Sequence, residues 1–315
     1  MNVKRKKSGF TIVELLTVLA IIAMLVGLLV PALNLVRNIA KETTQKAQLT
    51  TIGLALMTFK NDSDSGDYPP SDWPVPPRGP GDYCGAQKLA EALLGWDLMG
   101  FHPDSHWQAD GRNNIPYTIG GTTYPPDGYF FYDPTNPVDM DKRKGAYLEL
   151  ATANAFRLGI SGPVSRDGLF DDPAPLARHT FVICDVFGVK KINIIPPGPA
   201  GKTEFFKAGT PILYYKANTS GKTIREIYNV RDNVPLTTQL KSIADGKDHP
   251  LGNPGGRYEF FYGDLIIDPD QVIGYIQNPK VTPTDWPYRH DSYILISAGL
   301  DGEYGTKDDI RNFGN

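Results

Sequence analysis

A long apolar run near the N-terminus dominates the pattern of hydrophobic and polar positions. From Phe10 to Val36 the only charged residue is Glu14. The stretch from Phe10 to Val30 would span roughly 31 Å as a helix, at about 1.5 Å per residue, which matches a bilayer core of about 30 Å. We therefore expect residues 10–30 to cross a membrane.

A different pattern follows Pro31. Apolar residues now recur mostly at spacings of three and four as far as Phe59, with charged and amide side chains between them. This spacing predicts an amphipathic helix whose apolar face lies on a globular domain. We expect one helix over residues 10–60, transmembrane over 10–30 and amphipathic over 31–60, with a candidate kink at the proline.

Beyond residue 60 the pattern breaks into short elements separated by turn residues, which predicts a globular domain over residues 61–315. Strands are expected at Thr180–Val186, Ile212–Tyr215, Tyr258–Tyr262, Leu265–Ile267 and Ser292–Ala298, and short helices at Ala86–Leu94, Ala146–Phe156 and Pro235–Ala244. Residues 100–145 are rich in Gly, Pro, Asn and Asp and form a loop-rich insertion. The expected fold class is α+β, with the long N-terminal helix packed on an antiparallel sheet.

Composition and charge predict a folded protein and the orientation of its chain across the membrane. Hydrophobic residues make up 41% and charged residues 21%, which is typical of a folded protein. A net charge of −3 does not indicate nucleic-acid binding, which usually needs a basic surface. Lys4, Arg5, Lys6 and Lys7 precede the apolar run, so residues 1–9 should stay in the cytoplasm while the remainder crosses the membrane.

Only two cysteines are present, Cys84 and Cys184. This number excludes a disulfide-dense scaffold and a four-cysteine zinc site. In an exported domain the two could form one disulfide bridge. Two buried thiols are the alternative, since sequence alone does not supply the geometry that a bridge needs.

Glu14 decides between three explanations of the N-terminus. A cleaved secretory signal has a shorter apolar run and a cleavage site with small residues. A plain signal anchor explains the length but not the carboxylate, which is costly inside a bilayer without a partner. A precursor whose cleavage creates that partner explains both features.

The sequence KKSGFTIVELL at residues 6–16 resembles the signature of type IV prepilins and of type II secretion pseudopilins. The resemblance implies that a prepilin peptidase cuts between Gly9 and Phe10, removes residues 1–9 as a leader, and that the new N-terminus is N-methylated. Pro31 also falls where this family often has a proline.

The resemblance further implies a role for Glu14 in assembly. Cleavage leaves a cationic amine on Phe10, near the carboxylate on the same helix. In the family's filaments the helices pack in parallel with an axial stagger, so one subunit's glutamate meets the amine of a neighbour. An unpaired charge within such a bundle would be strongly destabilising.

The C-terminal segment SAGLDGEYGTKDDI, residues 297–310, offers a candidate metal site. Carboxylates and carbonyls on a flexible, glycine-rich backbone suit calcium, although an acidic surface turn has the same composition. The EF-hand pattern is missing. The segment resembles the calcium-binding C-terminus of the major pseudopilin of type II secretion, which implies Asp301, Asp308 and Asp309 as side-chain ligands.

The resemblance covers residues 4–70 and 292–311, and the part between them is far larger than the compact domain of a major pseudopilin. The chain lacks the motifs G-x-S-x-G, Walker P-loop and H-E-x-x-H, so we do not expect an enzyme.

We expect a structural subunit that assembles with itself and other pilin-like subunits, in a type II secretion pseudopilus or a type IV pilus-like filament. Its partners would be the prepilin peptidase and the inner membrane, with the globular domain in the periplasm. Two alternatives stay open: an adhesive or ligand-binding pilin that uses the enlarged middle domain, and a membrane-anchored periplasmic enzyme.

Overall fold

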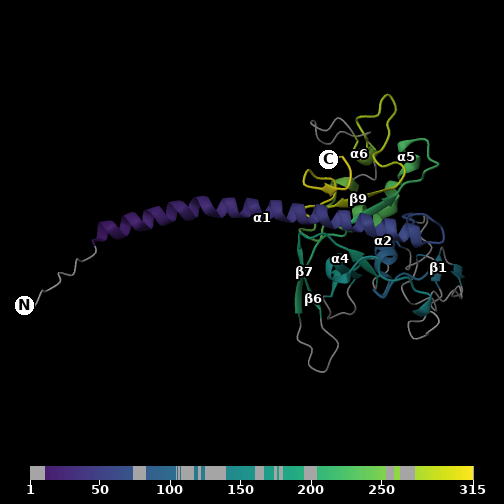
Figure 1. Ribbon diagram of the computed structural model, residues 1–315, viewed down its shortest axis with the longest axis horizontal. Helices are drawn as coiled ribbons and strands as arrows, with labels where there is room; N and C mark the ends of the chain where they lie inside the picture. Colours follow the sequence, from purple (N-terminus) through teal and green to yellow (C-terminus); the bar gives the residue numbers. More distant parts are fainter. Residues whose placement is uncertain are drawn as a thin grey trace, which may run out of the picture. The chain divides into compact units, whose positions relative to one another are not determined.

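The computed structural model of the 315-residue chain divides into two compact units, Met1–Thr43 and Thr44–Asn315 (Figure 1). It describes residues 11–73, 83–103, 105, 107, 117–119, 122–124, 140–159, 167–173, 176, 180–194, 204–252, 259–262 and 274–314.

The longest element is helix α1, Ile12–Asp62, which continues through Pro31 (Figure 1). It confirms the helix expected over residues 10–60, apart from a shift of a few residues at each end. Within the described part of the chain it is the one helix long and apolar enough to cross a membrane, and none of its most apolar stretch is buried.

The part of α1 that belongs to the second unit is amphipathic, as the spacing of apolar residues predicts. Its buried residues recur at helical spacing and form one face: Gln45, Gln48, Leu49, Ile52, Ala55, Leu56 and Phe59. Leu54 and Met57, on the other side, are exposed. The buried face therefore docks this half of the helix on the globular domain.

The other described helices are short. They are α2 (Gly85–Leu94), α4 (Leu150–Ala153), α5 (Ile224–Ile227) and α6 (Glu259–Tyr262), with 3-10 turns at Val230–Asn233 and Pro250–Gly252 and a π-helical turn at Pro235–Gln239. Every residue of α2 is buried. The helices expected at Ala86–Leu94 and Pro235–Ala244 are thus present, the second in a shorter form.

The described strands form two three-stranded sheets and two hairpins. The strands are β1 (Tyr117–Ile119), β2 (Thr122–Tyr124), β3 (Ala155–Gly159), β4 (Gly168–Phe170), β5 (Phe181–Ile183), β6 (Lys190–Ile194), β7 (Glu204–Ala208), β8 (Leu213–Lys216), β9 (Tyr293–Ser297) and β10 (Ile310–Arg311). The sheets have the orders β10-β9-β8 and β4-β3-β5, and the hairpins pair β1 with β2 and β6 with β7.

The sheet β10-β9-β8 is antiparallel and carries α1. Strand β9 is buried along its whole length. Tyr293 and Leu295 share a core with Leu56 of α1, while Ile294 and Ile296 share a second core with Phe261. Since side chains alternate along a strand, β9 supplies both cores from its two faces. The expected packing of the long helix on an antiparallel sheet is confirmed here.

The sheet β4-β3-β5 departs from the expectation of antiparallel strands. Strand β3 pairs with β5 in the antiparallel sense but with β4 in the parallel sense. The fold is α+β with mixed sheets.

Two expected elements are wrong. Glu259–Tyr262 is helix α6 rather than a strand, because a short apolar run fits either element and only its packing decides. The expected strand at Leu265–Ile267 lies outside the described residues. The helix expected over Ala146–Phe156 is reduced to α4, since Asn154 takes a left-handed conformation, with φ of 52°, and ends it before β3 begins.

Both cysteines are free thiols in this structure, so the candidate disulfide between Cys84 and Cys184 is not formed. Each side chain is fully buried in the same core. Burial raises the pKa of Cys84 to about 11 and that of Cys184 well above its usual value. The two cysteines are therefore buried thiols, which was the alternative to a disulfide bridge.

Candidate functional site

The first functional element is the start of α1, where Thr11 and Glu14 cap each other. The backbone N–H of Thr11 donates to Glu14 Oε2 at 2.8 Å, and the Thr11 hydroxyl donates to the same oxygen at 2.7 Å. In return the N–H of Glu14 donates to the Thr11 hydroxyl at 3.2 Å. This reciprocal arrangement is a capping box, and it satisfies donors that the first turn of a helix leaves free.

The capping box changes the account of Glu14. The carboxylate has partners on its own helix before any other subunit is present, so the cost of placing it in a membrane is reduced. The pattern Thr-x-x-Glu is local, so it is the sequence signal from which this capping box could be predicted. The expected cleavage junction between Gly9 and Phe10 lies outside the described residues.

The second candidate element is the loop between β9 and β10. The first residue of β10, Ile310, pairs with Ser297, the last residue of β9, so the loop closes a hairpin. Gly299, with φ of 68°, lies so close to Asp308 that an added Cβ would meet the aspartate's backbone oxygen at 2.3 Å. Glycine is therefore required for this turn.

Asp301 and Asp308 lie together in this loop. Asp308 Oδ2 accepts from the N–H groups of Leu300 and Asp301, at 2.6 and 3.0 Å, and its Oδ1 accepts from the Thr306 hydroxyl at 2.5 Å. Burial and the charge of Asp308 raise the pKa of Asp301 to about 6. Burial acts on Asp308 as well, but these donors keep its pKa below the usual value. The pair is thus two like charges held in contact.

Asp309 points elsewhere. Its Oδ2 accepts from the N–H of Gly305 at 2.8 Å and from the hydroxyl of Tyr275. Its Oδ1 is buried and has no hydrogen-bond partner among the described residues. Burial raises the pKa of this carboxyl to about 8.

The expected calcium ligands are therefore gathered only in part. Within the described ranges no three His, Cys, Asp or Glu side chains lie close enough together to hold a metal ion. Two of the three aspartates meet, and the third, Asp309, is adjacent in sequence and offers an unpartnered oxygen. This donor set is compatible with calcium, which takes carboxylate and carbonyl oxygens from flexible loops.

A buried carboxyl beside the loop has no local signal in the sequence. Asp185 follows β5 and accepts from the N–H groups of Phe187 and Thr210 and from the hydroxyl of Ser297, at 3.2, 3.1 and 3.2 Å. Burial raises its pKa to about 7, and the charge of Asp308 adds to the shift. Its partners come from segments far apart in the chain, so periodicity and motifs could not identify it.

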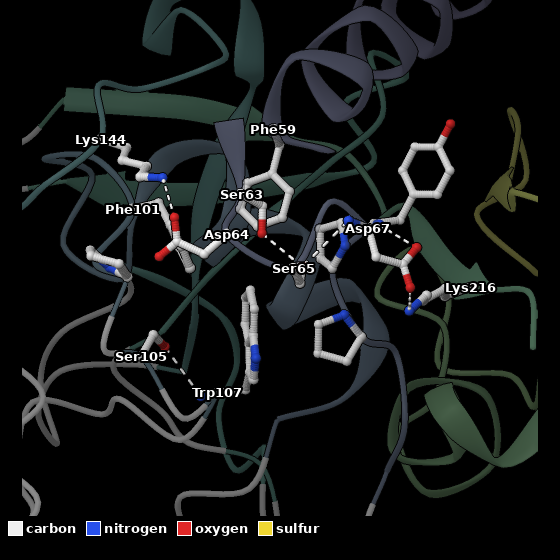
Figure 2. A pocket seen from close by; sticks show the side chains of 14 residues that line it. Phe59, Ser63, Asp64, Ser65, Asp67, Phe101, Ser105, Trp107, Lys144 and Lys216 are labelled. Atoms are coloured by element: carbon white, nitrogen blue, oxygen red, sulfur yellow. Dashed lines mark hydrogen bonds and ion pairs between the residues drawn. The ribbon is translucent and has the colours of Figure 1, made fainter. Parts of the chain in front are cut away.

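A third element is a cleft of about 410 Å³ beside the C-terminal end of α1 (Figure 2). Apolar rings from separate segments lie in it, namely Phe59, Phe101 and Trp107. Around them are hydroxyls and two ion pairs, Asp64 with Lys144 at 3.5 Å and Asp67 with Lys216 at 2.5 Å. No motif or spacing in the sequence connects these residues, because they come together only in the folded chain.

Comparison with known proteins informs the first of these elements. Residues 4–30 match the model of a family described as the prokaryotic N-terminal methylation motif. No curated protein and no solved structure matches the chain. The chain thus carries a type IV pilin-like prepilin signal followed by a long apolar helix. The motif implies processing by a prepilin peptidase and assembly with other pilin subunits in general.

Proposed function

We propose that this chain is a structural subunit of a type II secretion pseudopilus or of a type IV pilus-like filament. The observation that supports the proposal most is the methylation motif at residues 4–30, continuous with a helix whose apolar stretch has no partner among the described residues. Such a surface needs lipid or other subunits to cover it. Proteins of this class are usually structural, and we assign no reaction to the chain.

In this proposal the chain is cut after Gly9, methylated on Phe10, and held in the inner membrane with its globular domain in the periplasm. Glu14 would then gain a second partner during assembly. In the single subunit its carboxylate is held by Thr11, and in the filament it would also pair with the amine of a neighbour. The capping box supports this, because it keeps the carboxylate ordered at the start of the helix.

Replacing Glu14 tests the assembly step. Glu14→Ala should leave membrane insertion intact, because a costly charge is removed, while the yield of filaments sheared from native cells should fall at least about tenfold, as expected for a lost buried charge pair. Glu42→Ala, an acid farther along the same helix, is the matched control and should assemble normally. A wild-type filament yield from Glu14→Ala would refute the proposed pairing.

We also propose that the β9–β10 loop binds calcium. Asp301 and Asp308 would hold the ion, and Asp309, which faces Tyr275 here, would turn toward it as the third carboxylate. Support comes from the contact between two like charges and from the buried, unpartnered Oδ1 of Asp309. Calcium would supply the positive charge that these three carboxyls lack.

A further inference from the structure

We propose that the cleft beside the end of α1 binds a neutral carbohydrate, with one sugar ring stacked on Trp107. The proposal goes beyond filament assembly, and it gives the enlarged globular domain a ligand. Its parts are a partly exposed tryptophan ring, a strained backbone that presents the ring, and a polar rim whose charges are already paired.

The aromatic surface is the exposed part of the Trp107 ring, which borders the cleft and rests on Phe59 and Phe101, two rings buried in the core. The rings of Phe101 and Trp107 are stacked, with centroids 5.3 Å apart and an interplanar angle of 24°. Phe59 packs edge-on against Phe101 at 5.0 Å and lies 6.4 Å from Trp107. A sugar ring has a flat face of C–H groups with its hydroxyls at the edge, so it can cover the exposed part of Trp107 without burying its polar groups.

Trp107 is held in an unusual backbone conformation. Its φ is 61°, in the left-handed region that bulky residues rarely adopt. Its N–H donates to the hydroxyl of Ser105 at 3.2 Å, and that hydroxyl donates to the buried carboxyl of Glu91. Strained residues held by such contacts are concentrated at ligand sites. The ring packs against the core through Phe59 and Phe101 and stays half-buried, so part of it borders the cleft.

The polar rim favours a neutral ligand over an ion. Asp64 faces Lys144, and Asp67 faces Lys216, so an incoming cation or anion would compete with a partner already in place. A ligand with many hydroxyls can donate to the carboxylates and accept from the ammonium groups at the same time. The Asp64 side chain, at 90% exposure, is open to such contacts.

The size and shape of the site fit an oligosaccharide. The cleft's volume of about 410 Å³ lies within the range of roughly 300–1,000 Å³ for small-molecule sites. A second cleft of about 500 Å³ shares Asp67, Pro70 and Lys216 with it. The second cleft is lined by the buried Asp232, whose Oδ1 has no partner among the described residues. A chain of sugars could therefore continue from one cleft into the next.

Saturation-transfer NMR on the full chain tests this proposal. The protein is kept in a zwitterionic detergent without sugar groups, and cellobiose, maltose and N,N′-diacetylchitobiose are the probes, each at millimolar concentration. We expect at least one of them to receive saturation mainly on the C–H protons of one ring face. No transfer to any of the three, or displacement of a bound sugar by choline at equal concentration, would overturn the proposal.

Substitutions locate the site. Trp107→Ala should weaken binding at least about tenfold, as for an aromatic residue at the centre of a binding site, whereas Trp107→Phe, which keeps a ring, should retain part of it. Phe205→Ala is the matched control, because it removes an aromatic side chain that is 59% exposed outside the cleft. Equal losses in Trp107→Ala and Phe205→Ala would contradict the assignment, as would wild-type binding by Trp107→Ala. Processing and filament yield are separate readouts, so this failure would leave the proposed filament role standing.

Discussion

Three carboxyl groups of this chain differ in the donors that hold them and in their burial. Glu14 is held by the N–H and hydroxyl of Thr11. Asp308 is held by backbone N–H groups of its own loop. Glu91 receives one hydrogen bond, from Ser105, and its Oε2 is buried without a partner among the described residues. Ionisation of Glu91 should therefore destabilise the folded protein.

Glu91→Gln should accordingly stabilise the protein in alkaline conditions. Burial raises the pKa of Glu91 from its usual 4.5 to about 7. The unfolded chain therefore releases this proton near pH 4.5, while the folded chain keeps it until about pH 7. Between these values the glutamate makes stability fall as pH rises, and the full penalty is present above pH 7. Glutamine has no such penalty and still accepts from Ser105.

The expected gain is on the order of 2–3 kcal/mol at about pH 8, and most of it should disappear at about pH 5. Denaturant unfolding of the full chain in detergent at both pH values measures it. Glu149→Gln, at an exposed position, is the control and should change stability little at either pH. A gain for Glu91→Gln of the same size at both pH values would contradict the electrostatic explanation.

At the scale of elements, the end of α1 is fixed to the domain by both apolar and amide side chains. Leu56 is fully buried, in one core with Leu295 of β9. Gln48 donates through Nε2 to the carbonyl of Cys184 at 2.9 Å, and Gln45 accepts from the N–H of Val186 at 2.9 Å. The helix thus covers apolar area and satisfies backbone groups that follow β5.

The same substitution, leucine to alanine, at a buried and at an exposed position of α1 tests this docking. Leu56→Ala should destabilise the globular domain by about 2–5 kcal/mol, because it leaves a cavity in the core. Leu54→Ala, at a position that is 61% exposed, should change stability by less than about 0.5 kcal/mol. Thermal or denaturant unfolding compares the two. Similar losses would mean that the docking face has been assigned wrongly.

The elements that the sequence predicts well are those with strong local patterns. Helix α1 has a long apolar run followed by helical spacing, and β8 and β9 are short runs of aromatic and aliphatic residues bounded by turn residues. The strand predicted where α6 lies was wrong, because Phe260 and Phe261 are buried by packing that a four-residue run does not reveal. The parallel pairing of β3 with β4 also depends on contacts between distant segments.

The candidate sites divide in the same way. The methylation motif, Glu14 and the acidic loop at residues 297–310 are local, so the sequence could identify them. The contact of Asp309 with Tyr275 joins segments far apart in the chain, and so does the cluster of Phe59, Phe101 and Trp107. No spacing rule connects such residues, and only the folded structure brings them together.

At the scale of the whole molecule, the sheet β10-β9-β8 joins the proposed roles. One of its faces carries α1, and the hairpin between two of its strands carries the acidic loop. An ion bound in that loop would close the hairpin and stabilise the sheet on which the helix is docked. Calcium should therefore act on the stability of the entire globular domain.

The full chain in detergent should unfold at a higher temperature with millimolar calcium than with chelator. The gain is about 2.7 kcal/mol when the ion is a hundredfold above its dissociation constant, and extracellular sites commonly have constants of about 10⁻⁴–10⁻³ M. Magnesium should substitute poorly, since it demands stricter geometry. Asp301→Asn combined with Asp308→Asn should abolish the shift, and Asp291→Asn at an exposed position should keep it. If calcium does not change the unfolding temperature, the calcium site is refuted and the loop is an acidic surface turn.

The central claim, that the chain is made as a prepilin-like precursor and matures into a filament subunit, is tested most directly by its mass. The chain should be isolated from membranes of its native host and its intact mass measured, with Gly9→Val as the variant that should block processing. The account predicts a mature species that begins at N-methylated Phe10 and lacks residues 1–9. A stable species that retains Met1 and carries no added methyl group would contradict it.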